Sequence, residues 1–337
     1  MAKVSVIGAG SWGTALSIVL ANNGHEVTVW SILEEEVRML ASQHEHKEKL
    51  PGVKIPETIA YTTDMETAVR GKELLVLAVP SAFTRSTAHT MAPFVSEGQL
   101  IVEVAKGIEE DTLMIQSDIV EQEISQALVT VLSGPSHAEE VGRALPTTVV
   151  AGAKTKVAAE RVQSYFMNEY FRVYTSPDML GIELGASLKN VIALAAGMAD
   201  GLGYGDNTKA ALITRGIGEI GRLALAMGAK QETLSGLSGI GDLIVTCASR
   251  HSRNRKAGML MGQGYTMEEA VAEVKMVVEG IYSAKAAKEL GKQYCVDLPI
   301  IEEVNRVLFE GHSARDAVQE LMLRDKKAEY AQLGWEE

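Results

Sequence analysis

Lys189 lies within the stretch GASLKNVIALAAG, residues 185–197, whose other side chains are nearly all small or apolar. On a helix over residues 182–198, its neighbours three, four and seven positions away offer no carboxylate, so no ion pair within that helix explains the cation. Those neighbours are Gly185, Ala186, Ile192, Ala193 and Ala196. One interpretation is that the lysine snorkels from a helix edge into water. We favour the other, in which it points into a cleft. Burial and a second cation such as Lys106 would then lower its pKa and let it exchange a proton with a substrate hydroxyl, for which the small neighbours leave room.

A locally basic segment, SGIGDLIVTCASRHSRNRKAG, spans residues 238–258. Asp242 is its only acidic residue. The charged residues that follow it are all basic, namely Arg250, Arg253, Arg255 and Lys256. Arg253 and Asn254 could hydrogen-bond a phosphate, the arginine in bidentate fashion, and Ser252 adds a hydroxyl. The alternative is a solvated basic helix start. Asp242 could orient the lysine of the apolar helix or bind a substrate hydroxyl, or it could merely cap the helix that follows.

Further polar residues follow the apolar runs that we interpret as strands. Lys106 comes directly after LIVEVA, and Ser81 follows ELLVLAVP. In open α/β sheets, ligands bind beyond the carboxyl ends of the strands, so we favour a functional lysine over a solvated loop residue. The segment SGPSHAEEVG places Gly134, Ser136 and Ala138 near a predicted helix start, where backbone N–H groups are free.

The glycine loop VIGAGSWG supplies Gly8, Gly10 and Gly13 in G-x-G-x-x-G spacing. In a dinucleotide-binding loop the first glycine permits the tight turn, the second admits the pyrophosphate and the third lets the helix pack on the strand. Such a motif alone is weak evidence, because glycine loops also form plain turns. Its position after the first strand of an alternating α/β chain favours a bound dinucleotide, with the pyrophosphate at the helix N-terminus.

The second predicted strand ends in VTVWSILEEEV and lacks the acidic residue that usually contacts an adenosine ribose. No Lys, Arg or His lies between Glu26 and Val37 to meet a 2′-phosphate, and the run 34–36 is three glutamates. Like charge repels a phosphate dianion, so we predict that NAD is preferred over NADP. The glutamates could equally well just begin a helix, where they suit the helix dipole, and the two readings are compatible.

These residues must be positioned by an alternation of strands and helices in the first half of the chain. The predicted strands are KVSVIGAG, HEVTVW, ELLVLAVP, QLIVEVAKG and ALVTVLSGP, with PTTVVAGA and FRVYTS added later. Continuous apolar strands separated by amphipathic segments indicate a parallel sheet covered on both faces, as in a Rossmann-type doubly wound α/β domain. After about residue 178 the strand pattern nearly vanishes. We therefore predict a dinucleotide-binding domain over 1–178 and an α-helical substrate-binding and catalytic domain over 179–337, with a ligand cleft between them.

Composition narrows the function classes. The chain has 337 residues with 46% hydrophobic and 23% charged residues, enough for a sizeable core. A formal net charge of −12 disfavours nucleic acid and anionic membrane as partners. Cys247 and Cys295 fit no metal spacing, and no other cluster suggests a metal. The chain begins with a strand rather than a signal peptide, and no charge-free apolar stretch approaches the roughly 20 residues that span a bilayer. We expect a cytoplasmic protein.

Taken together, the motifs resemble the bacterial-type NAD(P)-dependent sn-glycerol-3-phosphate dehydrogenases, in order from residue 4 to about residue 325. The resemblance rests on VIGAGSWGTAL, AVPS, AKGIE, SGPSHAEEV, ELGASLKNVIALAAGMADGLGYGDNTKAALITRG, GLSGIGDLIVTCASRHSRNRKAG and VEGIYSAKAA. It implies the reversible reduction of dihydroxyacetone phosphate to sn-glycerol 3-phosphate, a precursor of the phospholipid backbone. It also implies a homodimer. Many relatives carry a basic residue where Ile32 or Leu33 stands here, which agrees with the preference for NAD.

The resemblance also implies roles for individual residues. Lys189 matches the family's proton acceptor, and Lys106 matches the lysine that contacts both cofactor and substrate. With these two lysines, Asp242 is our third catalytic candidate. Cofactor positions are matched by the loop Gly8, Gly10 and Gly13, and by Ser11, Trp12, Lys106, Ala138, Arg253, Val277 and Glu279. Substrate positions are matched by Lys106, Gly134, Ser136, Lys189, Asp242, Ser252, Arg253 and Asn254. One rival interpretation is a related lysine-dependent β-hydroxyacid dehydrogenase, which the basic segment disfavours. The other is a non-catalytic dinucleotide sensor, which the lysine in the apolar helix disfavours.

Overall fold

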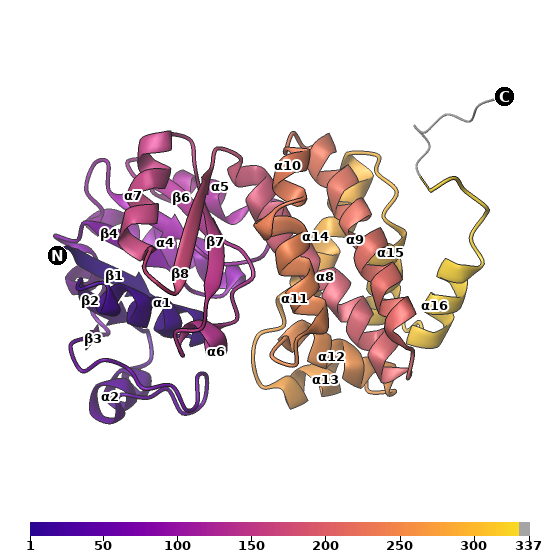
Figure 1. The fold of residues 1–337 in the computed structure, drawn as a ribbon, viewed down its shortest axis with the longest axis horizontal. Coiled ribbons are helices and arrows are strands. Elements are labelled where there is room, and N and C mark those ends of the chain that lie inside the picture. The colour runs from indigo at the N-terminus through magenta and orange to yellow at the C-terminus, as the bar shows by residue number, and fades with distance from the viewer. Residues whose placement is uncertain (330–337) are drawn as a thin grey trace.

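A single sheet organises the N-terminal half of the chain in this computed structural model, which describes residues 1–329. Within those residues eight strands lie in the order β3-β2-β1-β4-β5-β6-β7-β8 (Figure 1). They are β1 (Lys3–Ile7), β2 (Glu26–Trp30), β3 (Ala60–Thr62), β4 (Leu74–Leu77), β5 (Leu100–Glu103), β6 (Leu128–Ser133), β7 (Thr147–Ala153) and β8 (Phe171–Ser176). The predicted strands are all present, and the short edge strand β3 was not predicted. The doubly wound α/β fold class is confirmed.

One pairing differs from the predicted parallel sheet. Strands β6 and β7 are antiparallel, whereas all other neighbouring strands are parallel. Residues 134–146 between the two strands contain only the single-turn helix α6 (Ala138–Val141). A parallel connection usually carries a full α-helix, which this segment lacks, and the chain turns back on itself here.

Helices cover both faces of the sheet. They are α1 (Ser11–Asn22), α2 (Glu34–Gln43), α3 (Met65–Val69), α4 (Thr84–Met91), α5 (Gln116–Glu123), α6 and α7 (Lys156–Phe166), with 3₁₀ turns η1 (Ser81–Phe83) and η2 (Ala92–Phe94). Side chains alternate along each strand, so β1 contributes to two cores. Val4 and Val6 pack with Leu16 of α1, while Ile7 packs with Met91 of α4 on the other face.

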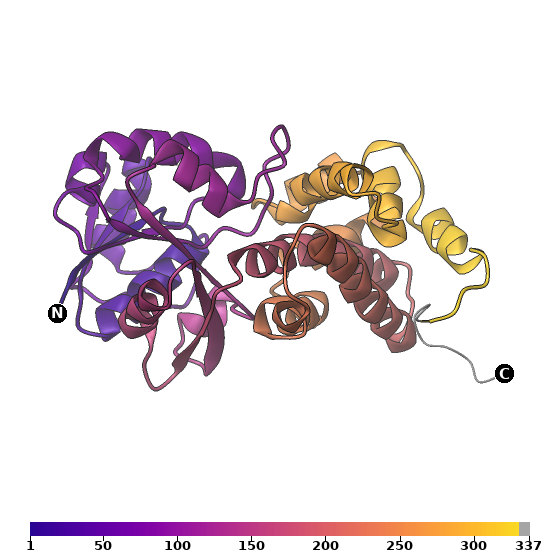
Figure 2. The same cartoon turned by 90° about the horizontal axis from the view of Figure 1, so that it is seen from above.

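The second half of the chain is helical and lies beside the sheet (Figure 2). Its helices are α8 (Met179–Gly201), α9 (Asp206–Ala226), α10 (Gln231–Leu234), α11 (Asp242–Ala248), α12 (Arg253–Gly262), α13 (Met267–Val274), α14 (Glu279–Gln293), α15 (Pro299–Phe309) and α16 (Ala314–Met322), with a π turn η3 (Leu237–Gly241). Strand β8 ends just before Pro177 and α8 begins just after it. Residues 330–337 of the second predicted domain lie outside the described residues.

Helix α8 is the central element of the helical half and is longer than the predicted 182–198. It packs against α9, α11, α12, α14 and α15. By length and composition alone it could cross a membrane, but 94% of its most apolar window is buried inside the protein. That burial is what a core helix shows, and the surrounding helices supply the apolar environment.

Helices α8 and α12 cross at van der Waals contact because glycines line both faces. A methyl group on Gly197 would lie 2.1 Å from the carbonyl oxygen of Arg255, and one on Gly258 would lie 2.1 Å from that of Leu194. Gly201 and Gly262 repeat the arrangement one turn further along. Side chains at these positions would force the two backbones apart, so the spacing of the helices is fixed by the glycines.

Two carboxylates of the helical half bind serines of the sheet half and tie the two together. Glu183 of α8 accepts hydrogen bonds from the backbone N–H and the hydroxyl of Ser117 on α5. Glu279, at the start of α14, does the same with Ser81 after β4. Burial raises the pKa of Glu183 to about 7. The paired hydrogen bonds satisfy carboxylate oxygens that would otherwise be stranded out of water.

The glycine crossing gives a stability prediction. Replacing a helical glycine by alanine normally stabilises a protein by up to about 1 kcal/mol. Gly258→Ala should instead lower the free energy of unfolding by about 2 kcal/mol, because its methyl group meets backbone. The control is Gly218→Ala on α9, where the added methyl group meets only the Arg222 guanidinium at 3.6 Å. Calorimetric melting of both variants checks this, and equal Tm values would contradict it.

Candidate active site

The glycine loop between β1 and α1 has the geometry of a phosphate cradle. Gly8 has a φ of +116°, and a methyl group there would lie 2.6 Å from the carbonyl oxygen of Ala78. A methyl group on Gly13 would lie 2.0 Å from the carbonyl oxygen of Gly8, so this glycine allows α1 to pack on the loop. A methyl group on Gly10 would meet nothing within 4 Å. The three glycines therefore form the turn, the helix contact and an open approach, as the spacing predicts. Backbone N–H groups of Ser11 and Trp12 at the first turn of α1 can hold a pyrophosphate there.

The carboxyl end of β2 lies next to this loop, because the Gly8 N–H donates to the Trp30 carbonyl at 2.9 Å. Beyond it, Ile32 and Leu33 are 77% and 55% exposed, and helix α2 begins at Glu34. The glutamates do begin a helix, which is compatible with the charge argument. Two of the three glutamates, however, have partners that offset their charge. Glu34 forms an ion pair with Arg38, and Glu36 is buried among partners from a later segment.

Lys189, Asp242 and Lys106 form a cluster between the two halves of the chain. The Lys189 Nζ lies 2.8 Å from Asp242 Oδ1, and the Lys106 Nζ lies 2.7 Å from Asp242 Oδ2. Lys189 is 5% exposed, so the interpretation that it snorkels into water is wrong. Lys106 extends from the segment after β5 and also donates to the carbonyl of Gly134 at 3.0 Å. One carboxylate thus holds two cations from two parts of the fold.

Burial and charge set the protonation of this cluster. Burial lowers the pKa of Lys189 to about 8, with Lys106 adding to the decrease and Asp242 opposing it. Burial acts to raise the pKa of Asp242, but the two ammonium groups hold it below its ordinary value. Asp242 is therefore ionised, and the Lys189 amine could both give and take a proton near neutral pH.

Two residues that the sequence interpretation missed position the cluster. Thr246 lies one turn after Asp242 on α11, and its hydroxyl accepts a hydrogen bond from the Lys189 Nζ at 2.6 Å. The same hydroxyl donates to the Asp242 carbonyl at 2.6 Å. Asn190 donates to the Lys106 carbonyl at 3.2 Å and accepts from Asn254 at 2.9 Å. The i,i+4 spacing of Asp242 and Thr246 was a usable signal for the threonine.

The structure corrects two further interpretations around this cluster. Helix α11 begins at Asp242 itself, and Gly241 occupies the capping position, so Asp242 is not an N-cap. The small neighbours of Lys189 do not all leave room for a substrate. A methyl group on Gly185 would lie 2.6 Å from the carbonyl oxygen of Ser238, so backbone already fills that space. Gly185 serves close packing between α8 and the η3 turn.

Some side chains of the basic segment are held by protein partners and others are not. The Ser252 hydroxyl accepts from the Arg255 N–H and caps α12. Arg255 is paired with Asp200 at 2.6 Å. Asn254 is buried and its oxygen accepts from the Gly280 N–H, which leaves one of its two amide hydrogens for a ligand. Within residues 1–329, no hydrogen bond or ion pair involves the half-buried Arg253 side chain, so its guanidinium remains available to bind an anion.

The loop after β6 approaches the lysine cluster from the sheet side. Gly134 has a φ of +147°, and its carbonyl accepts from both Lys106 and the Ser136 hydroxyl. His137, which the sequence interpretation missed, lies next in this loop and Ala138 begins α6. The His137 Nε2 is buried without a hydrogen-bond partner among the described residues. Burial and the neighbouring lysines lower its pKa to about 4, so the ring is neutral.

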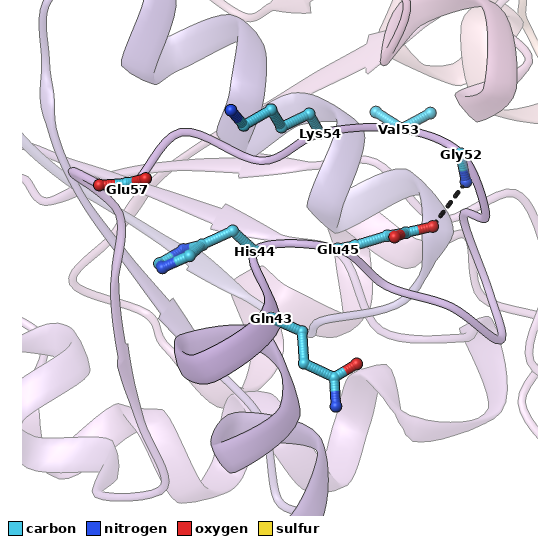
Figure 3. A pocket seen from close by; sticks show the side chains of 7 residues that line it. All are labelled: Gln43, His44, Glu45, Gly52, Val53, Lys54 and Glu57. Atoms are coloured by element: carbon cyan, nitrogen blue, oxygen red, sulfur yellow. Dashed lines mark hydrogen bonds between the residues drawn. The ribbon is translucent and has the colours of Figure 1, made fainter.

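The two remaining predicted residues of the helical half are Glu279 and Val277. Glu279 binds Ser81, so its carboxylate is already engaged. Val277 is partly buried in the segment before α14. Among residues 1–329 no cluster of His, Cys, Asp or Glu could hold a metal ion. A surface pocket lies along the segment after α2 (Figure 3), and its lining includes none of the predicted site residues.

Comparison with known proteins gives a consistent family assignment. Residues 3–159 match the family model described as NAD-dependent glycerol-3-phosphate dehydrogenase N-terminus, and residues 178–319 match the model of the C-terminus. The chain is 72% identical to a glycerol-3-phosphate dehydrogenase [NAD(P)+] of Agathobacter rectalis over 99% of this chain and 100% of that protein. It is 58% identical to that of Fusobacterium nucleatum, with 98% and 99% covered. The crystal structure of glycerol-3-phosphate dehydrogenase from Coxiella burnetii superposes with a TM-score of 0.92 at 36% identity, covering 96% of this chain and 99% of that one.

The Thr246 hydroxyl yields a prediction about the lysine that it binds. Thr246→Val keeps the shape but leaves the Lys189 ammonium without one hydrogen-bond acceptor, which disfavours the charged form. We expect the pKa that governs catalysis by Lys189 to fall below about 8, while Thr246→Ser restores it. The pH dependence of kcat for the three proteins measures this shift. Identical profiles for wild type and Thr246→Val would contradict the assigned contact.

Proposed function

The chain belongs to the NAD-dependent glycerol-3-phosphate dehydrogenase family, and on this premise we propose which of its residues bind the substrate and move the proton. It is an NAD(P)-dependent oxidoreductase that interconverts sn-glycerol 3-phosphate and dihydroxyacetone phosphate. The nicotinamide of the cofactor supplies or accepts the hydride. The protein must therefore hold the substrate carbon against it, provide or remove one proton, and neutralise the charge that develops on the substrate oxygen.

Lys189 is the proposed proton donor and acceptor. The observation that carries this assignment is the position of its amine, buried between the Asp242 carboxylate and the Thr246 hydroxyl. A substrate hydroxyl that replaces one of these contacts meets an amine whose pKa of about 8 allows transfer in both directions. Asp242 stabilises the ammonium form of Lys189, since an unpaired buried cation is strongly disfavoured.

Lys106 and Arg253 are the proposed electrostatic contacts of the substrate. Lys106 is partly exposed. Its ammonium adds a second positive charge beside Lys189 and can stabilise the alkoxide that develops on the substrate. Arg253 carries a guanidinium without a protein partner among the described residues, at the start of α12 where helix N–H groups also favour an anion. We infer that it binds the substrate phosphate with the free amide hydrogen of Asn254. A phosphate held there orients the reacting carbon from a distance.

NAD is the proposed preferred cofactor. Exposed Ile32 and Leu33 follow β2, and neither offers charge to a 2′-phosphate. Glu35 adds negative charge beside them, since no hydrogen bond or ion pair within residues 1–329 involves its side chain. Steady-state kinetics with NADH and NADPH test the preference, and a lower KM for NADPH would overturn it.

The two rival interpretations are separated by one assay. Loss of NADH absorbance at 340 nm with dihydroxyacetone phosphate, and not with a panel of simple hydroxyacids and their keto forms, supports the proposed substrate. Turnover of a hydroxyacid would support the lysine-dependent β-hydroxyacid dehydrogenase. NADH binding without any turnover would support the sensor. We further propose, from the family resemblance alone, a cytoplasmic homodimer, and light scattering of the purified protein tests the dimer.

Removing the proposed proton donor should abolish most of the activity. Lys189→Met keeps the length of the side chain and removes the amine, so kcat should fall by about 10²–10⁴-fold. NADH binding, measured by fluorescence, should remain. The control is Lys156→Met on α7, whose side chain is 83% exposed, and which should retain wild-type kcat. Near wild-type kcat in Lys189→Met would rule out the assigned role.

The two reaction directions should show opposite pH dependence. Reduction needs the protonated amine, so its kcat falls as pH rises through about 8. Oxidation needs the neutral amine, so its kcat rises through the same pH. Measurements should start above pH 7, where the substrate phosphate is already largely a dianion because its second pKa is about 6. Flat profiles in both directions between pH 7 and pH 9.5 would contradict the assignment.

A further inference from the structure

Glu36 is a largely enclosed carboxylate whose three partners come from two segments of the chain. Its side chain is 9% exposed and accepts hydrogen bonds from the hydroxyl of Ser31 and from His46, the latter at 3.0 Å. The ammonium of Lys49 forms an ion pair with the same oxygen that His46 contacts. Burial acts to raise the pKa of Glu36, but the hydrogen bonds outweigh it and lower the pKa to about 2. The carboxylate is therefore ionised and held in place by three side chains.

This network stands at the place where a Rossmann-type fold contacts the adenosine ribose. Ser31 immediately follows β2, whose last residue binds the glycine loop through the Trp30 carbonyl. An acidic residue at the end of the second strand usually binds the ribose 2′-hydroxyl, whereas a basic one accommodates a 2′-phosphate. In this chain Ser31 stands at that place. Glu36 and Lys49 bring an acid and a base to it from outside the strand.

The segment after α2 is built so that Lys49 reaches this point. The Leu50 N–H donates to the His46 carbonyl at 2.8 Å and the Ile55 N–H donates to that of His44 at 2.8 Å. Leu50 and Ile55 are fully buried, which anchors the segment on the domain core. Figure 3 shows the outer side of this segment, where Glu45 binds the Gly52 N–H. Leu50 anchors the backbone next to Lys49, whose side chain is 32% exposed.

We propose that the Glu36–Lys49 pair sets the cofactor preference: Lys49 is the cation that can meet a 2′-phosphate, and Glu36 holds it and cancels its charge. This inference rests on the proposed function and explains it in part, since it replaces free glutamate charge with one specific pair. NADPH must compete with Glu36 for the ammonium, whereas the 2′-hydroxyl of NADH does not need it. The Glu36–Lys49 ion pair is short-ranged and partly solvated, so we expect it to affect the binding of the cofactor alone.

The experiment compares charge removal at Glu36 with the same change two residues earlier on the same helix. Glu36→Gln frees Lys49, and the ratio of kcat/KM for NADPH to that for NADH should rise by about tenfold or more at low salt. The matched control Glu34→Gln removes an equal charge from an exposed pair on the same helix, and should change the ratio less than about twofold. The double variant Glu36→Gln/Lys49→Met should lose the gain. Dissociation constants of NADH and NADPH from fluorescence titration should follow the same order without turnover.

Each outcome is decisive. Equal ratios for Glu36→Gln and Glu34→Gln would overturn the proposal. A gain that persists in the double variant would show that Glu36 acts by repulsion alone and would overturn the role of Lys49. Should Glu36→Gln not fold, Lys49→Met provides the test, because it should lower NADPH binding relative to NADH, and an unchanged ratio would refute the proposal. Failure of the wild-type protein to oxidise NADH with dihydroxyacetone phosphate would instead contradict the proposed function.

Discussion

The site depends on one carboxylate that is shared by two ammonium groups. Asp242 is buried, and its two oxygens bind Lys189 and Lys106 at 2.8 and 2.7 Å. Asp242 favours the charged form of the buried Lys189, and the carboxylate itself is stabilised in this buried position by the two ammonium groups. Because the three residues come from α8, from the segment after β5 and from α11, the arrangement exists only when the sheet half and the helical half are together. The chemistry is thus a property of the junction rather than of either half.

The surrounding contacts show how the junction is kept in register. The same region contains hydrogen bonds from Ser117 to Glu183 and from Ser81 to Glu279, so carboxylates of the helical half repeatedly face donors on the sheet half. Asn190 connects the backbone of Lys106 to Asn254, which lies beside the proposed phosphate contact. A chain of polar contacts therefore runs from the lysine cluster to the start of α12, where we propose that the substrate phosphate binds. Networks of this kind fix geometry more than they add stability.

Much of the fold could be predicted from the sequence because it follows from local patterns. Apolar runs gave the strands, the glycine spacing gave the phosphate loop, and a lone cation in an apolar helix led to Lys189. The antiparallel direction of β7 was not predicted, since the sequence did not show that the segment after β6 forms only a single helical turn. The pairing of Glu36 with Lys49 joins residues that no periodicity relates. The role of Gly185 was misread because its neighbour, the Ser238 carbonyl, is distant in sequence. Contacts of this sort are decided by tertiary packing.

The glycine-lined crossing of α8 and α12 has a consequence for how the proposed substrate contacts can move. Lys189 lies on one of these helices and Arg253 begins the other, and their backbones touch at Gly197 and Gly258. Any movement of the helical half against the sheet half should therefore carry the backbones of both residues together. The proposed proton donor and the proposed phosphate contact would then approach or leave the nicotinamide as one unit, and only the half-buried Arg253 side chain could adjust its reach to the substrate.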